Sequence, residues 1–284
     1  MDNGNYIIKK VLNNNAVAAL DKSNKEVILS GKGIGFQRAK GDIISNDEAI
    51  EKVFVLNSDS QYEQMLRLFS ENDESVMRVV AEYVRYVEKR LEGALPSHFL
   101  LVLIDHLAFV IKRLQQGINI HNPFLYDVRI LYPQEYALAQ EGVNIIQEQL
   151  NISIPDDEIA FLALHLHSGR INRSLSQINI FTELITKLIR VIEIELALEI
   201  DRTSLDYVRL LTHIRFLIEQ AESRLPFERE SRLSRVLQRE YPLCYNVAWK
   251  LVKILQNELQ ADIPEAEAGY IAMHLQRILE KSNS

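Results

Sequence analysis

The chain has 284 residues, 47% of them hydrophobic and 25% charged, which suits a globular protein of about two domains or slightly more. A net charge of −7 argues against a protein that binds nucleic acid over its whole surface, and the single cysteine, Cys244, excludes an internal disulfide. The start of the chain shows no secretory signal, and the most apolar run, residues 98–112, is interrupted by Asp105 and His106. We therefore expect a cytoplasmic protein without membrane insertion.

Residues 1–56 predict a small antiparallel β-sheet. Short segments rich in β-branched and aromatic residues alternate there with turn sequences such as NNN, DKSNK and GKG. The predicted strands are residues 6–12, 16–20, 25–31, 34–39 and 51–56. So small a sheet buries little apolar surface alone, so we expect it to dimerise. Its eight basic and seven acidic residues give a net charge of +1, which leaves −8 for the rest of the chain and favours this module for any polyanion contact.

Two turns in this module carry residues suited to RNA. Asparagine side chains can contact bases and sugars, glycine permits close backbone approach, and Phe36 can stack on an unpaired base. Lys32, Arg38 and Lys40 can contact phosphates. The GKGIG sequence lacks the GxxxxGK[ST] spacing of a phosphate-binding loop. A plain hairpin with Asn and Gly turns and a core phenylalanine explains the same residues equally well.

Residues 57–64, NSDSQYEQ, are polar and predict a linker. Beyond them apolar residues recur at spacings of three and four, which predicts helices for nearly all of the remaining chain. No helix-turn-helix pattern precedes residue 65, which argues against a DNA-binding regulator that carries the same helical part.

The helical part contains an internal repeat. Residues 132–167 align without gaps on residues 241–276, with 14 of 36 positions identical, and LIDHLAFVI (103–111) matches LLTHIRFLI (210–218) upstream. The repeated unit is roughly a hundred residues long, far longer than the units of about 20–50 residues that form solenoids. The repeat therefore predicts two duplicated all-α helical bundles.

Two pairs of histidines occupy matching positions in the repeats. His106 corresponds to His213, and His165 corresponds to His274, whereas Gln276 stands opposite His167. Acidic residues near the start of the last helix of each repeat, including Glu158 and Glu267, complement the positive end of the helix dipole. Packing alone does not require a titratable residue at two positions in both copies.

Three interpretations of the histidines remain open on the residues alone. A metal site is disfavoured because His165 and His167 point about 200° apart on a helix, and because we find no cysteine ligands and no supporting acidic residues at repeated positions. Hydrogen-bonded core histidines are the second interpretation. The third is phosphorylation, since a neutral imidazole is a good nucleophile and the added charge would disfavour an apolar interface. Asp105 either orients His106 or is a solvated surface residue. We expect no catalytic residues, metal or cofactor.

The motifs, in their order and spacing, resemble a known family over the whole chain. KKVLNNN, GKGIGF and EKVFVL resemble the co-antiterminator RNA-binding module, and DHLAF, LALH, THIRF and YIAMH resemble paired domains regulated by the sugar phosphotransferase system (PTS). The chain is thereby identified as similar to transcriptional antiterminators of the BglG/SacY type, especially the glucose-operon antiterminators of Gram-positive bacteria.

The resemblance implies the domain organisation and the site residues. It implies an RNA-binding domain at 1–56, a linker at 57–64, and regulatory domains at 65–170 and 171–284. The implied RNA contacts are Asn13, Asn15, Gly31, Lys32, Gly33 and Phe36. Lys32 stands where several relatives carry arginine, so a bidentate guanidinium contact is unavailable there. The implied phosphorylation sites are His106 and His165 in the first domain and His213 and His274 in the second.

The resemblance also implies a mechanism in which the chain is not itself an enzyme. A homodimer binds a hairpin in the leader of a sugar-uptake mRNA and prevents a terminator from forming. Enzyme II of the sugar permease, expected to be that for glucose, phosphorylates the first regulatory domain and inactivates the protein, and HPr acts on the second. The rival functions are a DNA-binding regulator under PTS control and a helical metalloenzyme.

Overall fold

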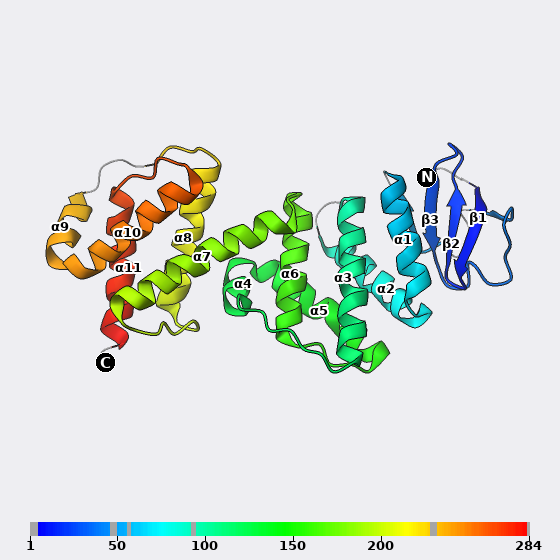
Figure 1. Ribbon diagram of the computed structural model, residues 1–284, viewed down its shortest axis with the longest axis horizontal. Coiled ribbons are helices and arrows are strands. Elements are labelled where there is room, and N and C mark those ends of the chain that lie inside the picture. The colour runs from blue at the N-terminus through cyan, green and yellow to red at the C-terminus, as the bar shows by residue number, and fades with distance from the viewer. Residues whose placement is uncertain (1–4, 46–49, 56–57, 92–94, 228–231, 283–284) are drawn as a thin grey trace. The chain divides into compact units, whose positions relative to one another are not determined.

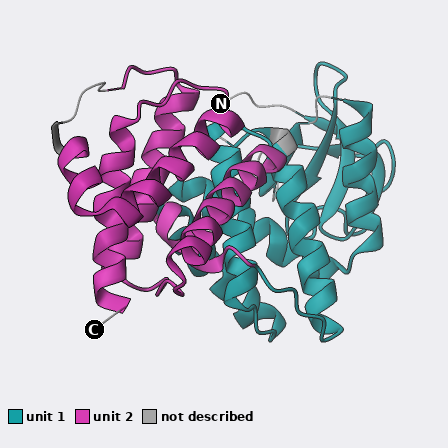
Figure 2. Cartoon of the chain, turned by 60° about the vertical axis from the view of Figure 1, so that its left-hand side comes forward, with its two compact units in different colours: residues 1–122, 134–174 teal, residues 123–133, 175–284 magenta. Residues whose placement is uncertain are grey.

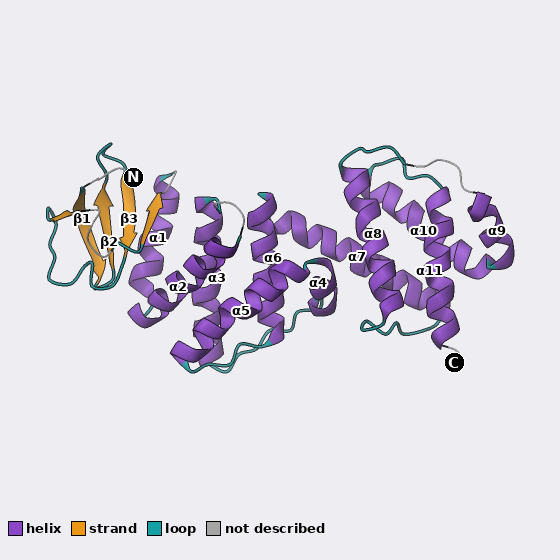
Figure 3. Ribbon diagram, turned by 180° about the vertical axis from the view of Figure 1, so that it is seen from behind, coloured by secondary structure: helices purple, strands orange, loops and turns teal. Residues whose placement is uncertain are grey.

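A computed structural model describes residues 5–45, 50–55, 58–91, 95–227 and 232–282 of the chain. The chain forms two compact units: residues 1–122 with 134–174, and residues 123–133 with 175–284 (Figure 2). Strands occur at the start of the first unit and helices make up the rest (Figures 1 and 3). The predicted fold class, a small antiparallel sheet followed by helical bundles, is confirmed.

The sheet has the strand order β4-β1-β2-β3-β5, and all its pairings are antiparallel. The strands are β1 (Tyr6–Asn13), β2 (Ala16–Leu20), β3 (Glu26–Ser30), β4 (Ile43–Ile44) and β5 (Lys52–Val55). Val17 in the central strand β2 pairs with Val11 on one side and Leu29 on the other. Short turns join β1 to β2 and β2 to β3, as the NNN and DKSNK sequences predict.

The predicted strand at residues 34–39 is wrong. This segment belongs to a chain of turns in which Gly33 and Gln37 have φ angles of 71° and 54°, incompatible with an extended strand. The two-residue strand β4 follows it and was missed because it is too short to show alternation. Residue 56, the end of the last predicted strand, lies outside the described residues.

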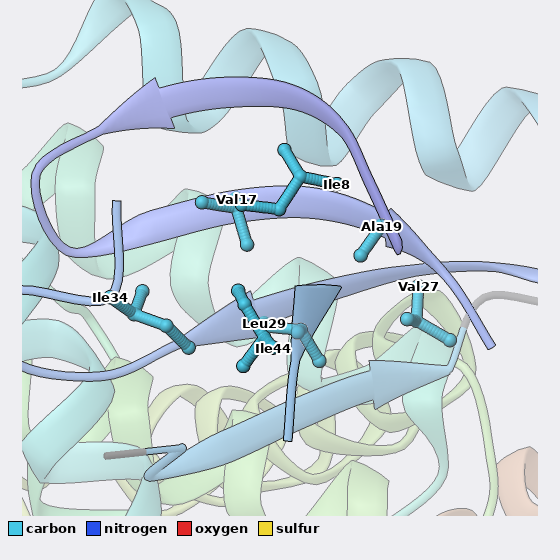
Figure 4. Close-up of a cluster of buried hydrophobic side chains, with 7 residues drawn as sticks. All are labelled: Ile8, Val17, Ala19, Val27, Leu29, Ile34 and Ile44. Carbon is cyan, nitrogen blue, oxygen red and sulfur yellow. The ribbon is translucent and has the colours of Figure 1, made fainter. Parts of the chain in front are cut away.

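Both faces of the sheet bury apolar side chains. Seven residues form one cluster (Figure 4): Ile8, Val17, Ala19, Val27, Leu29, Ile34 and Ile44. The other face carries Ile28 and its register partner Phe54, whose ring lies 6.4 Å from that of Phe69 in helix α1 (Asp59–Glu71). A helix of the same unit therefore supplies apolar cover that the sheet lacks by itself.

Helix α1 begins within the segment that we expected to be a linker. Its N-cap is Ser58, whose side-chain oxygen accepts a hydrogen bond from the backbone N–H of Gln61. Residues 59–64 are therefore helical. The buried residues Met65, Leu68 and Phe69 follow on the face that packs towards the sheet.

The helical part of the first unit contains α2 (Glu74–Arg90), α3 (Ser97–Gln115), α5 (Pro133–Leu150) and α6 (Asp156–Ile171). Helix α3 packs against both α2 and α6. Gly142 lets α5 approach α2, because a Cβ atom there would overlap the ring of the fully buried Tyr83. Within the described parts of the chain, no helix is long and apolar enough to cross a membrane.

The second unit contains α4 (Leu125–Leu131), α7 (Leu175–Leu196), α8 (Leu205–Glu222), α9 (Arg232–Glu240), α10 (Pro242–Leu259) and α11 (Ala266–Ser282). The sequence repeat appears as matching helices, since α3, α5 and α6 correspond to α8, α10 and α11. The two repeats differ in how their shortest helices, α4 and α9, pack. Helix α9 packs on α10 and α11 of its own repeat, whereas α4 packs on α8.

A buried polar network holds α4 to α8. The hydroxyl of Tyr207 donates a hydrogen bond to the Asp127 carboxylate and accepts one of 2.9 Å from Arg202 Nη1. Burial raises the pKa of Asp127, against the opposing effect of the Tyr207 hydrogen bond. Arg215 Nη1 also donates to the Leu131 carbonyl at 2.6 Å. The segment that belongs by sequence to the first repeat thus folds as part of the second unit.

We predict that Tyr207→Phe destabilises the second unit by about 1–3 kcal/mol, because the buried Asp127 carboxylate loses its donor. Urea unfolding followed by circular dichroism measures the change. Tyr126→Phe is the matched control, since Tyr126 lies on the same helix and is exposed. Equal stability of the two variants would show that the network does not anchor α4.

Candidate functional site

The turn between β1 and β2 is bonded to the loop that follows β3. The Oδ1 atom of Asn15 accepts a hydrogen bond of 2.7 Å from the Gly33 N–H, and its carbonyl accepts one of 2.9 Å from the Gly31 N–H. The Asn13 side chain accepts a bond of 2.9 Å from the Asn15 N–H. Four of the six predicted RNA contacts therefore lie in one hydrogen-bonded cluster of turns.

The loop at residues 31–37 directs its side chains to opposite sides. Ile34 enters the core of the sheet, whereas Phe36 has 59% of its surface exposed and Lys32 is exposed. A Cβ atom on Gly35 would overlap the carbonyl oxygen of Asn13, so glycine permits this close approach. The interpretation of Phe36 as a core phenylalanine is thereby excluded. An exposed aromatic ring in a loop that also exposes a lysine is suited to stacking on a base.

A carboxylate of the helical part reaches the asparagine turn. Glu74, the first residue of α2, accepts hydrogen bonds from Asn15 Nδ2 at 2.6 Å and from Asn14 Nδ2 at 3.2 Å. Sequence reasoning missed both Asn14 and Glu74 as members of this cluster. The contact joins residues about sixty positions apart, and no motif links them.

Ion pairs extend the contact between α2 and the sheet. Lys52 lies 2.5 Å from Glu88, and Arg85 lies 3.0 Å from Glu51. A cavity of about 290 Å³ separates α2 from the loops, and residues of both signs line it together with apolar ones. Its lining includes Asn13, Asn15, Gly31, Lys32, Glu74, Arg78 and Arg85.

The first pair of histidines lies between α3 and α6. The ring centroids of His106 and His165 are 4.4 Å apart. Glu158 on α6 is buried, with its Oε2 atom 4.0 Å from His106 Nε2 and its Oε1 atom 2.5 Å from Arg113 Nη2. Residues fifty-nine positions apart in sequence thus form one site around a buried carboxylate.

The second repeat forms the same arrangement between α8 and α11. The ring centroids of His213 and His274 are 5.6 Å apart, and Glu267 Oε2 lies 3.4 Å from His213 Nε2. Glu267 occupies the position of Glu158 in the repeat. The four histidines therefore form two equivalent pairs, each facing one matched glutamate.

Burial keeps His106, His165 and His274 neutral near pH 7. Desolvation, followed by the charges of His165 and Arg113, lowers the pKa of His106 to about 3, and desolvation lowers the pKa of His165 to about 4. Desolvation also lowers the pKa of His274 to about 4, with further lowering by His213. Near neutral pH each of these rings carries a lone pair available for nucleophilic attack.

His167 and Asp105 do not take part in the first pair. His167 Nδ1 lies 3.0 Å from Glu135 on α5, away from His165, as the helical spacing predicts. Asp105 is exposed and makes no hydrogen bond or ion pair within the described structure, so it does not orient His106. Among the described residues, no group of three or more His, Cys, Asp or Glu side chains is placed to hold a metal ion.

Known protein families account for both parts of the chain. Residues 6–63 match the CAT RNA binding domain, and residues 81–169 and 186–278 each match the PRD domain. The chain belongs to the family of PRD-containing antiterminators. The resemblance seen in the sequence motifs is confirmed.

Several antiterminators align with this chain over nearly their full length. The PtsGHI operon antiterminator of Bacillus subtilis (strain 168) is 40% identical over 98% of this chain and 99% of its own. The GlcA/glcB genes antiterminator of Staphylococcus carnosus (strain TM300) is 33% identical over 98% and 97%. A crystal structure of GlcT CAT-PRDI matches 58% of this chain and 98% of its own, with 38% identity and a TM-score of 0.54.

In this PRD-containing antiterminator, Glu158 and Glu267 belong to the histidine sites, which the sequence did not lead us to expect. We interpreted Glu158 and Glu267 as helix-dipole partners and found no acidic residues repeated beside the histidines. The gapless repeat contains that signal, because each glutamate lies seven positions before a paired histidine and so on the same helix face. The buried cation of the first repeat, Arg113, has no such signal, since Gln220 replaces it in the second.

We predict that stability falls as pH is lowered from about 6.5 to 4. The folded-state pKa of His165 is below its ordinary value, so the unfolded chain binds more protons in this range. This histidine alone accounts for a loss of about 2 kcal/mol between pH 7 and pH 5.

Urea unfolding at the two pH values measures this loss. His165→Leu should reduce it by about 1–2 kcal/mol, because the variant removes the titrating ring. His121→Gln is the control, since His121 is exposed. The same pH dependence in His165→Leu and in the unaltered chain would contradict the burial of a neutral ring.

Proposed function

We propose that this chain binds a hairpin in the leader mRNA of a PTS sugar-uptake operon, that of glucose, and so prevents a transcription terminator from forming. The observation that carries the proposal is the presence, in one chain, of two features. One is a hydrogen-bonded cluster of asparagine and glycine turns whose loop exposes Lys32 and Phe36, and the other is the two matched histidine pairs. No enzymatic reaction of its own is needed, because phosphoryl donors act on the chain.

We assign the RNA contacts to Asn13, Asn15, Gly31, Lys32, Gly33 and Phe36. Support comes from the exposure of Phe36 and Lys32 and from the hydrogen bonds that gather the other four into adjoining turns. Phe36 would stack on an unpaired base, and the lysine would contact a phosphate. A structured loop of this kind limits the conformational entropy lost when RNA binds.

We assign phosphorylation to His106 and His165 in the first PRD and to His213 and His274 in the second. Enzyme II of the glucose permease acts on the first pair to inactivate the protein, and HPr acts on the second. The support is chemical, since an imidazole with a free lone pair is nucleophilic and a phosphoryl group brings most of two negative charges. His165 has 5% of its surface exposed, so its phosphorylation requires α3 and α6 to open.

We propose self-association through the helix faces beside these histidines. Phe109 and Phe216 occupy matching positions, one turn after His106 and His213, and are 59% and 56% exposed. Large apolar side chains exposed at the same place in both repeats suit a homodimer interface. Phosphorylation beside such an interface would oppose dimerisation and thereby weaken RNA binding.

The proposed domains are residues 1–56, 65–170 and 171–284, with 57–64 joining the first two. Their functions place the protein in the cytoplasm, where leader transcripts and PTS phosphoryl donors occur. The buried free thiol of Cys244 is compatible with a reducing compartment.

We predict that Phe36→Ala weakens binding of the full chain to its leader hairpin by about 10-fold or more, because one base loses its stacking partner. Gel-shift titration against the native hairpin and an unrelated one measures it. Tyr126→Ala, an exposed aromatic change on α4, is the control. Wild-type binding that does not distinguish the two hairpins would contradict the proposed specificity.

We predict that combining His106→Ala with His165→Ala gives antitermination in cells without glucose, because the inhibitory phosphoryl group has no acceptor. A reporter placed behind the leader measures it. The control His121→Ala alters an exposed histidine outside both pairs and should remain sugar-dependent. Continued shut-off of the double variant without sugar would contradict the inhibitory assignment.

A further inference from the structure

The two ring nitrogens of the first histidine in each pair have different surroundings. The Nε2 atoms of His106 and His213 are buried and make no hydrogen bond within the described structure. Each nevertheless faces a carboxylate, at 4.0 Å from Glu158 Oε2 and at 3.4 Å from Glu267 Oε2. About a fifth of each side chain is exposed, 20% and 21%, so the exposed part of the side chain does not include Nε2.

A carboxylate beside Nε2 affects phosphoryl transfer in two ways. It favours the tautomer in which Nε2 carries the proton, because that N–H can then point at a negative oxygen, and this leaves the lone pair on Nδ1. It also opposes a phosphoryl group on Nε2, whose oxygens would be placed beside the carboxylate in a poorly solvated region. Both effects act in the same direction.

We propose that Glu158 and Glu267 are positioning residues that direct phosphorylation of His106 and His213 to the Nδ1 atom. The inference rests on the proposed function, in which these histidines accept phosphoryl groups. The same orientation occurs in both repeats, although Gln220 replaces Arg113 in the second. The glutamate is therefore the shared element, and the arginine is not.

Phosphoryl transfer to His106 or His213 replaces a bond to phosphorus on the donor with a bond to Nδ1. The Nδ1 lone pair attacks the phosphorus of a phosphohistidine or phosphocysteine on the donor protein, and a P–N bond forms. The donor's P–N or P–S bond breaks, and its electron pair stays on the donor nitrogen or sulfur. The acceptor ring becomes cationic, and its Nε2–H either donates to the glutamate or passes its proton to it.

The second histidine of the second pair has the opposite arrangement. The Nδ1 atom of His274 is buried and has no hydrogen-bond partner in the described structure, so Nε2 is the nitrogen left for a donor. The second PRD would therefore carry 1-phosphohistidine, the Nδ1 isomer, at His213 and 3-phosphohistidine, the Nε2 isomer, at His274. Two chemically distinct products would arise within one pair.

The test identifies the phosphohistidine isomer at each site in the full chain. The protein is phosphorylated with phosphorylated HPr and, separately, with a phosphorylated enzyme II domain, and is read by isomer-specific antibodies and by ³¹P NMR without denaturation. Variants that retain one of the four histidines assign each signal. We expect at least about tenfold more 1-phosphohistidine than 3-phosphohistidine at His106 and His213, because of the adjacent carboxylate.

The outcomes separate this inference from the proposed function. Phosphorylation at His106 or His213 that is mainly the 3-isomer would overturn the inference and leave the proposed function standing. No phosphorylation of any of the four histidines by either donor would overturn the proposed function, and the inference with it.

A substitution tests the role of the carboxylate. Glu267→Gln keeps the side-chain shape but removes the charge, and no arginine equivalent to Arg113 is left unpaired. We expect the tenfold excess of 1-phosphohistidine at His213 to be lost. Glu265→Gln is the matched control, because Glu265 lies two residues earlier and is 64% exposed. An isomer ratio unchanged by Glu267→Gln would show that Glu267 does not position the ring.

Discussion

One buried carboxylate in each repeat determines how the last helix meets the helix that carries the first histidine. In the first repeat, Glu158 on α6 is fully buried and approaches both His106 and Arg113 of α3. An unpaired carboxylate at that depth would cost several kcal/mol, so α3 and α6 are constrained to keep their partners in contact. The second histidine lies on the same face of α6 and is carried into the site by this constraint. The histidine pair is thus a consequence of helix packing around the glutamate.

The two repeats satisfy the same constraint with different charges. The first uses a buried guanidinium. The second lacks it and instead surrounds His274 with Arg209, Arg277 and the ion pair of Asp206 with Lys281, none of which has a charged counterpart in the first repeat. Similar geometry with unequal charge means that one modification need not have the same energetic effect at both sites. The two repeats thus share the paired histidines but differ in the charged side chains that surround them.

The structural features that depend on residue periodicity and on the internal repeat were predicted from the sequence. The sheet, the helical bundles and the four paired histidines follow from β-branched segments, from apolar spacing and from the gapless alignment. What it missed depends on contacts between distant residues. Strand β4 is too short to show a pattern, Ser58 starts a helix in a polar segment, and α4 packs on α8 through Asp127 and Tyr207. The bond from Asn15 to Glu74 likewise joins residues that no local rule relates.

The carboxylate of Glu74 occupies hydrogen-bond donors of the asparagine turn that a ligand could also use. The Nδ2 groups of Asn14 and Asn15 both donate hydrogen bonds to Glu74, the first residue of helix α2. A ligand that uses those amides must displace the carboxylate, so the free energy of binding is a difference between two sets of hydrogen bonds. By linkage, any change that draws α2 away from the sheet lowers the cost of that displacement, and a ligand bound at the turn makes it easier for α2 to move away. The hydrogen bonds to Glu74, together with the ion pairs of Lys52 with Glu88 and of Arg85 with Glu51, then set how strongly α2 and the sheet influence each other.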